Sequence, residues 1–108
     1  MARNILFICS QNKWRSPTAE HIFANYPNIN SMSAGLNHDA ETPITPELLE
    51  WADTIFVMEK AHKTKLSLRY KKYLHNKKII CLNIPDNFKF MDEKLVALLL
   101  LKVKPFLH

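Results

Sequence analysis

Residues 4–20 read NILFICSQNKWRSPTAE and decide the fold. Their first part, residues 4–8, is an apolar run, as expected of a strand that is buried on both faces of a sheet. A polar stretch follows, and Ser16-Pro17 then indicates a helix start, because proline is favoured in the first helical turn. The segment therefore predicts a buried strand, a loop and a helix in direct succession.

The same alternation continues along the chain. Further strands are predicted at residues 29–34, 53–58 and 78–82, and further helices at residues 46–51, 59–73 and 92–103. Alternating strands and helices are typical of a parallel sheet covered by helices on both faces. We therefore expect an α/β three-layer sandwich around a central four-stranded parallel sheet. No linker or internal repeat interrupts the pattern, so residues 1–108 are expected to form one domain.

Composition excludes several classes of protein. A hydrophobic content of 47% suits a packed core, and the longest apolar run, residues 95–101, is too short to span a bilayer. The N-terminus lacks a secretory signal, so a cytoplasmic location is expected. Cys9 and Cys81 are too few for a secreted disulfide scaffold. The only glycine, Gly35, excludes Gly-rich nucleotide loops and is expected at a position that needs positive φ.

The formal net charge is +5, and its excess is local. A short stretch carries eight basic residues: Lys60, Lys63, Lys65, Arg69, Lys71, Lys72, Lys77 and Lys78. Such a run attracts phosphate groups or nucleic acid. A solvated surface is the favoured interpretation, and a nucleic-acid partner is the less favoured one.

The loop after the first strand carries the chemistry. Ligands of such folds bind at the carboxyl ends of strands, and a helix N-terminus suits an anion such as phosphate. The five residues between Cys9 and Arg15 can curl so that their amides form an anion-binding nest. The arginine fork can close over two phosphate oxygens, and the same field favours the nucleophilic thiolate of Cys9. Ser16 can donate a hydrogen bond to that thiolate, and Asn12 can bond across the loop.

With these residues in view, the chain resembles the low-molecular-weight protein tyrosine phosphatases. The segment from Cys9 to Pro17, with Ala19-Glu20, looks like their phosphate-binding loop. The resemblance continues in Ser33-Ala34-Gly35, in residues 52–58 and in Ile84-Pro85-Asp86. It covers most of the chain in the family's order.

The resemblance implies a role for each matched residue. Cys9 would be the nucleophile that forms a phosphocysteine, Arg15 would bind the phosphoryl oxygens, and Asp86 would act as general acid. The substrate phosphate would be bound within the loop by Ser10, Gln11, Asn12, Lys13, Trp14 and Ser16. No metal or other cofactor is implied. Asp92 is the weaker candidate for the acid, because locally it reads as a helix cap.

Three departures from the family bear on the substrate. Gln11 stands where the family usually has glycine, so it must tolerate an unusual backbone angle or reshape the loop. Trp14 replaces a second loop cysteine, which argues against the related thioredoxin-coupled arsenate reductases, since these need resolving thiols. The loop at residues 36–45 is short and has no aromatic residue, so Trp14, Phe88 and Phe90 are candidates to line the entrance.

The expected partner is therefore a phosphorylated substrate, either a protein or a small molecule. A phosphotyrosine-like monoester follows from the resemblance, and nucleotides or 2′,3′-cyclic nucleotides are the alternative. A second alternative is a phosphate- or nucleic-acid-binding protein without turnover. No membrane partner is expected, and the apolar helix at residues 92–103 leaves a monomer or a weak homodimer open.

The histidines suggest no metal site. Their spacings, with those of the two cysteines, match no zinc pattern. His38 is the one candidate for a binding role at the site, although a surface position is favoured for it. The histidines concerned are His21, His38, His62, His75 and His108.

Overall fold

The computed structural model describes residues 2–107. Four strands form one parallel sheet in the order β2-β1-β3-β4. Their bounds are β1 Arg3–Cys9, β2 Ile29–Gly35, β3 Thr54–Val57 and β4 Lys78–Cys81. The predicted central four-stranded parallel sheet is confirmed. The central position of β1 places its carboxyl end, Cys9, between the ends of two neighbouring strands.

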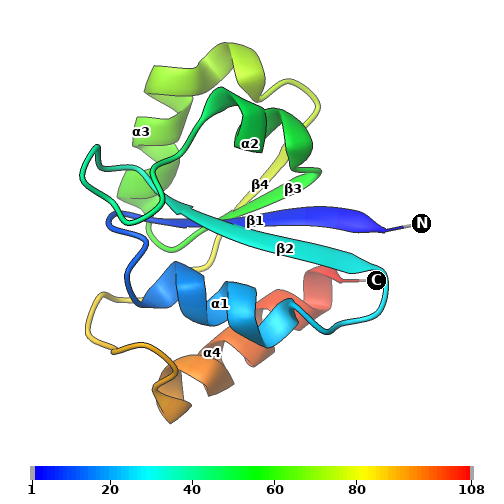
Figure 1. The fold of residues 1–108 in the computed structure, drawn as a ribbon, viewed down its shortest axis with the longest axis vertical. Helices are drawn as coiled ribbons and strands as arrows, with labels where there is room; N and C mark the ends of the chain where they lie inside the picture. Colours follow the sequence, from blue (N-terminus) through cyan, green and yellow to red (C-terminus); the bar gives the residue numbers. More distant parts are fainter. Residues whose placement is uncertain (1, 108) are drawn as a thin grey trace.

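Helices cover both faces of this sheet (Figure 1). The helix α1 (Arg15–Phe23) and the helix α4 (Glu93–Val103) lie on one face. The short helix α2 (Pro46–Trp51) and the helix α3 (Lys60–Tyr70) lie on the other. Two 3-10 turns, η1 (Lys71–Tyr73) and η2 (Lys104–Phe106), follow α3 and α4. The three-layer α/β sandwich is therefore confirmed.

The two cores follow from the alternation of side chains along β1. Ile5, Phe7 and Cys9 point to the cluster that contains the buried residues of α1 and α4. Leu6 and Ile8 point to the opposite cluster, against α2 and α3. Because successive side chains of a strand point to opposite faces, a continuous apolar run was needed to fill both layers.

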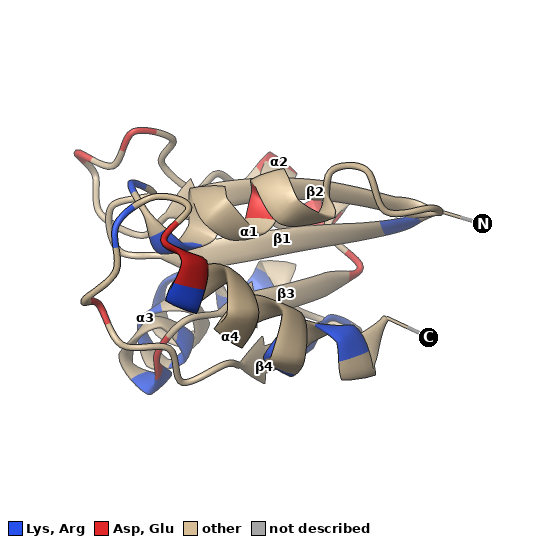
Figure 2. Ribbon diagram, turned by 90° about the horizontal axis from the view of Figure 1, so that it is seen from below, with Lys and Arg blue, Asp and Glu red and all other residues tan. Residues whose placement is uncertain are grey.

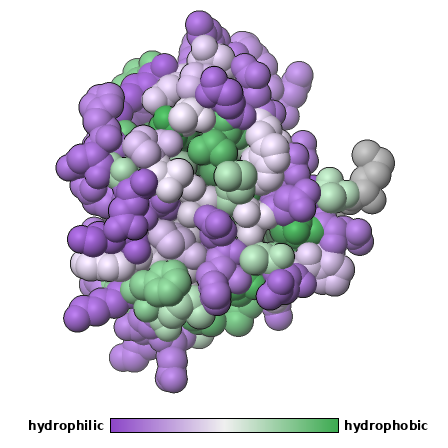
Figure 3. All heavy atoms as spheres, in the orientation of Figure 1, coloured by the Kyte–Doolittle hydropathy of each residue, from purple (hydrophilic) through white to green (hydrophobic). Residues whose placement is uncertain are grey.

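The C-terminal helix α4 is a core helix, as favoured from its sequence. Leu95, Leu99 and Val103 are fully buried, whereas Leu101 is 71% exposed. Apolar side chains reach the surface in separate patches among hydrophilic ones (Figure 3). The expected monomer or weak homodimer stays a prediction. No helix within residues 2–107 is both long and apolar enough to cross a membrane.

The prediction for Gly35 is wrong. Its φ is not positive; within residues 2–107 the positive φ values belong to four asparagines and Met91. What Gly35 provides is space. A Cβ atom there would lie 2.5 Å from the Ala40 Cβ, 2.7 Å from the Ser10 carbonyl oxygen and 2.9 Å from the Asn12 nitrogen. The strand end thus lets two loops approach each other closely.

Candidate active site

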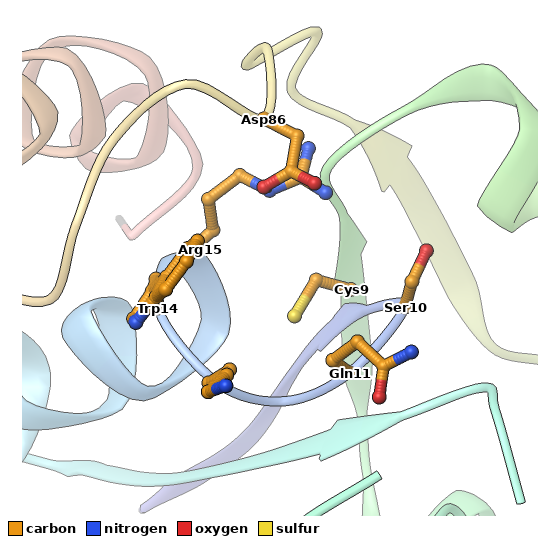
Figure 4. Close-up of a pocket in the computed structure, with 7 residues that line it drawn as sticks. Cys9, Ser10, Gln11, Trp14, Arg15 and Asp86 are labelled. Carbon is orange, nitrogen blue, oxygen red and sulfur yellow. The ribbon is translucent and has the colours of Figure 1, made fainter. Parts of the chain in front are cut away.

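Carboxyl ends of three strands meet at one edge of the sheet and bring the candidate residues together. Cys9 ends β1, Glu59 follows β3, and Asp86 follows β4. Cys9 and Asp86 line a pocket of about 210 Å³, and Glu59 reaches it through its bond to Arg15. Figure 4 shows the Cys9 sulfur pointing into the space that the loop encloses, with Arg15 and Asp86 side by side across it. The residues that line this pocket are Cys9, Ser10, Gln11, Lys13, Trp14, Arg15 and Asp86.

Cys9 is buried at the base of the loop, with polar donors around its sulfur. The Asn12 backbone N–H donates to Sγ across 3.2 Å, and the Ser16 hydroxyl lies 2.9 Å from Sγ. The same hydroxyl lies 3.0 Å from Oδ1 of Asn12, to which it can donate. The Ser16 hydroxyl has one proton and can donate only one hydrogen bond at a time. It can donate to Asn12 while Cys9 is a thiol, and to the sulfur when Cys9 is a thiolate.

Asn12 sets the curl of the loop. Its φ is +54°, a left-handed conformation in which asparagine is enriched, and it is buried. Gln11, one residue earlier, is exposed and has no positive φ. Of the two outcomes expected for Gln11, the unusual backbone angle is not found, because the left-handed position belongs to its neighbour. The departure from glycine at Gln11 changes the rim of the pocket and leaves the turn in place.

The segment after β2 supports the loop from outside. Backbone N–H groups of Leu36, Asn37 and Glu41 donate to the carbonyls of Cys9, Ser10 and Gln11 at 3.0 Å each. With those carbonyls directed outward, the loop amides are free to face the enclosed space. These three hydrogen bonds hold the segment after β2 against the loop, which is why the two approach so closely at Gly35.

Arg15 is 3% exposed and is held by the segments that follow β3 and β4. Its Nη1 donates to Oε2 of Glu59 across 2.6 Å and to the Ile84 carbonyl across 2.7 Å. Its Nε lies 3.6 Å from Oδ1 of Asp86, which is an ion pair too long for a hydrogen bond. Arg15 and Asp86, which are far apart in the sequence, therefore meet at the pocket.

Sequence reasoning missed Glu59 and His62. They form a capping box at the start of α3: the Glu59 side chain accepts from the backbone N–H of His62, whose ring accepts from that of Glu59. His62 is 3% exposed, and its Nε2 lies 2.9 Å from the Ser10 hydroxyl. A glutamate that follows a buried strand and precedes a helix by one residue was the available signal.

Burial, together with the Arg15 charge, lowers the pKa of His62 from 6.5 to about 4, although Glu59 acts in the opposite direction. The hydrogen bond from Arg15 lowers the pKa of Glu59 against the effect of burial. At neutral pH the site therefore contains a neutral His62 and an ionised Glu59. His62 cannot act as an additional cation there.

Asp86 and Asp92, the two candidates for the general acid, lie in different places. Asp86 lines the pocket, whereas Asp92 accepts a hydrogen bond from the Lys94 backbone N–H as the N-cap of α4. The predicted cap at Asp92 is confirmed, and only Asp86 adjoins Cys9 and Arg15. Its 62% exposed side chain leaves it free to meet a substrate.

Of the three aromatic residues expected to line the entrance, each lies in a different environment. Trp14 lines the pocket and is 38% exposed, with Nζ of Lys13 5.5 Å from its ring centre. Phe88 packs against the core on the α1 and α4 side. Phe90 packs edge-on against His21 and belongs to a separate hollow on α1. Only Trp14 of the three is an entrance residue.

The remaining histidines and the basic run lie outside the pocket. His38 is exposed and is not a lining residue, and His108 lies outside the described residues. Within residues 2–107, no three His, Cys, Asp or Glu side chains are grouped so as to hold a metal ion. The basic residues cover α3 and the segment after it (Figure 2). Two of them bind backbone carbonyls: Arg69 that of Leu36, and Lys77 those of Glu50 and Ala52.

A buried thiol in a loop at the carboxyl end of a central parallel strand, with an arginine facing it, is the arrangement expected of cysteine-dependent phosphatases. Comparison with known proteins points to the same class. A model described as low molecular weight phosphotyrosine protein phosphatase matches residues 4–53. The chain is also 30% identical to a protein-arginine-phosphatase of Bacillus subtilis, in a match that covers 65% of each. Over these residues the chain is similar to the low-molecular-weight phosphotyrosine protein phosphatases.

Solved structures extend this similarity to nearly the whole chain. The tyrosine phosphatase Wzb from Escherichia coli K30, in complex with phosphate, is 25% identical, with a TM-score of 0.77 over 98% of this chain and 96% of that one. A low molecular weight protein tyrosine phosphatase from Streptococcus pyogenes reaches a TM-score of 0.79 over 97% and 91%, at 17% identity. At 17% identity, the likeness to the Streptococcus pyogenes protein shows a shared fold and no more. The match covers 65% of the Bacillus subtilis relative, which is less than two thirds of its length.

Proposed function

We propose that this protein hydrolyses a phosphate monoester through a phosphocysteine on Cys9. The arrangement of the Cys9 sulfur carries the proposal. It lies at the base of the pocket, accepts from the Asn12 amide at 3.2 Å and faces Arg15 and Asp86. A nucleophile, an anion-binding loop and a carboxyl group at one pocket are the parts that this reaction needs.

In the first step the Cys9 thiolate attacks phosphorus and forms the S–P bond. The bond from phosphorus to the leaving oxygen breaks, and protonated Asp86 gives that oxygen its proton. The loop amides and Arg15 stabilise the charge on the three remaining oxygens, because they are fixed donors in a partly enclosed site. The Asn12 amide and the Ser16 hydroxyl stabilise the sulfur before attack and again as it leaves.

In the second step water replaces the thiolate. Ionised Asp86 takes a proton from the water, the water oxygen bonds to phosphorus, and the S–P bond breaks. Inorganic phosphate and the Cys9 thiolate are the products, so the protein returns to its starting state. Every group in both steps comes from the loop or from the segment after β4.

We infer that the leaving group is aromatic, as in a phosphotyrosine-like monoester. Trp14 supports this, because its half-exposed ring lies at the mouth of the pocket and can stack on a phenol. Lys13 stands beside that ring and disfavours a cationic leaving group. The relatives named above act on phosphotyrosine or phosphoarginine, so peptides carrying each belong in the test.

Hydrolysis of para-nitrophenyl phosphate by wild type and by Cys9→Ser tests the mechanism. We expect turnover by wild type and none by the variant; equal rates would exclude a covalent intermediate on Cys9. A substrate panel then tests the leaving group: a phosphotyrosine peptide, a phosphoarginine peptide, a nucleoside monophosphate and a 2′,3′-cyclic nucleotide. A higher kcat/KM for either nucleotide than for the phosphotyrosine peptide would contradict the aromatic assignment.

A further inference from the structure

The start of α3 is bonded to both ends of the candidate phosphate loop. At one end the Nε2 of His62 lies 2.9 Å from the Ser10 hydroxyl. At the other, Oε2 of Glu59 accepts from Nη1 of Arg15 across 2.6 Å. These residues are also bonded to each other, as a reciprocal capping box. One local structure therefore clamps a loop that is distant from it in sequence.

Glu59 determines which edge of Arg15 faces the ligand. A guanidinium has five N–H donors, of which Nη1 has two. Glu59 and the Ile84 carbonyl use both of them. Within residues 2–107 no residue accepts from Nη2, yet no buried side-chain nitrogen or oxygen lacks a partner. Nη2 is therefore open to solvent. Oδ1 of Asp86 lies 3.6 Å from Nε, too far for a hydrogen bond, so the edge formed by Nε and Nη2 can still donate to two oxygens of a phosphoryl group.

His62 fixes the other end through its tautomer. Its Nδ1 accepts from the backbone N–H of Glu59 across 3.1 Å, so Nδ1 has no proton. A neutral ring then has its proton on Nε2, from which it donates to the Ser10 oxygen. The Ser10 hydroxyl is thereby oriented, and the first residue after Cys9 is held in place.

We propose that Glu59 and His62 are positioning residues, which preorganise the loop and direct the Nε and Nη2 edge of Arg15 to the phosphoryl group. The inference rests on the proposed function for its effect on turnover. Binding of inorganic phosphate tests the positioning itself, because it requires no reaction. The capping box would thus serve both the stability of α3 and the affinity of a site one strand away.

Two substitutions of Glu59 separate position from charge. Glu59→Gln removes the negative charge and keeps an oxygen that can accept from Nη1. Glu59→Ala removes both. If Glu59 affected phosphate binding only through its charge, both variants would bind phosphate more tightly, because each removes an anion beside Arg15. Positioning predicts instead that Glu59→Gln binds as tightly as wild type or tighter, and that Glu59→Ala binds about tenfold more weakly than Glu59→Gln.

Calorimetric titration with inorganic phosphate measures these affinities. Glu59 is 43% exposed in its side chain, so both variants are expected to fold. Thr45→Ala is the matched control, since Thr45 caps α2 through the Leu48 N–H and is not a pocket-lining residue. Equal affinities of Glu59→Ala and Glu59→Gln would overturn the proposal. So would a similar loss of affinity in Thr45→Ala, which would point to general loosening by a lost cap.

His62 provides a second, independent test. The amide of His62→Gln can donate to Ser10 as Nε2–H does, whereas His62→Leu cannot. We expect His62→Leu to lower kcat for para-nitrophenyl phosphate about tenfold with a smaller change in KM, and His62→Gln to recover most of it. Equal kcat values in the two variants would overturn the role of His62.

The outcomes distinguish this inference from the proposed function. If wild type binds phosphate but turns over no ester, the proposed function fails, and the Glu59 comparison still decides the positioning. If wild type binds no phosphate, both fail. If wild type is active and the Glu59 variants bind phosphate alike, the positioning alone fails.

Discussion

At the scale of single residues, the site depends on two positions where the backbone has little freedom. Asn12 holds a positive φ inside the loop, and Gly35 leaves room for the loop to approach β2. Neither residue supplies a reacting atom. Both fix where the amides between Cys9 and Arg15 point, and the proposed chemistry needs those amides as preorganised donors.

Asn12 has two separable roles, which two substitutions distinguish. Asn12→Gly keeps the left-handed φ but removes the bond from Ser16, and Asn12→Ala loses both. A left-handed φ costs a residue with a Cβ about 1–2 kcal/mol. We expect stability and kcat/KM to fall in the order wild type, Asn12→Gly, Asn12→Ala, as measured by urea unfolding and para-nitrophenyl phosphate hydrolysis. An alanine variant as active as the glycine variant would show that φ at this position is unimportant.

Gly35→Ala should be destabilising because of lost space. The added methyl would meet the Ser10 carbonyl and the Asn12 nitrogen, which belong to the backbone and cannot turn aside. We expect a loss of about 1–3 kcal/mol in the free energy of unfolding, and weaker binding of inorganic phosphate. Asn30→Ala, which removes only one exposed hydrogen bond to Asn4 on the neighbouring strand, is the control and should cost no more than about 1 kcal/mol.

At the scale of elements, the start of α3 couples pH to stability. The pKa of His62 is lowered from 6.5 to about 4, so the unfolded chain takes up a proton there at a higher pH than the folded one. The stabilisation is complete above pH 6.5 and is lost as the pH falls towards 4. The total loss is roughly 3 kcal/mol, at about 1.4 kcal/mol for each unit of pKa difference.

Urea unfolding between about pH 5 and pH 7 measures this slope, above the range where Glu59 takes up its proton. His62→Gln should flatten the curve, since it has no ring to protonate. His75→Gln changes an exposed histidine and should leave the slope as in wild type. If wild type and His62→Gln have the same slope, burial of His62 is not the source of the pH dependence.

At the scale of the whole molecule, Arg15 connects three segments. It begins α1, bonds to Glu59 before α3, and bonds to the Ile84 carbonyl after β4. A phosphate bound to Arg15 and to the loop amides therefore stabilises contacts on both sides of the sheet. Ligand binding to the folded state alone contributes about 2.7 kcal/mol at a hundredfold excess over Kd.

We expect inorganic phosphate at that excess to raise the Tm by about 10–20 °C, since 1 kcal/mol corresponds to about 4–8 °C in a domain of this size. Differential scanning calorimetry measures the shift. Arg15→Lys should lose most of it, because a lysine offers no planar pair of donors. An equal shift in the lysine variant would show that charge alone binds the anion.

Short-range features were predictable from the sequence. The apolar run at residues 4–8, the Pro17 helix start, the Asp92 cap and the Cys9–Arg15 spacing each depend on neighbours along the chain, and each lies where it was expected. Local propensity and hydrophobic periodicity determine such elements directly. The parallel order of alternating strands and helices then followed from packing rules.

Only the tertiary structure decided which distant residues meet at the loop. Glu59 lies 44 residues from Arg15, and His62 lies 52 residues from Ser10. They adjoin the loop because β3 pairs directly with β1, a partnership that leaves no local signal in either strand. The same holds for Gly35, whose need for space arises from a loop that packs on it. The sequence by itself predicted the nucleophile and the anion-binding loop, and long-range packing determined what holds that loop in shape.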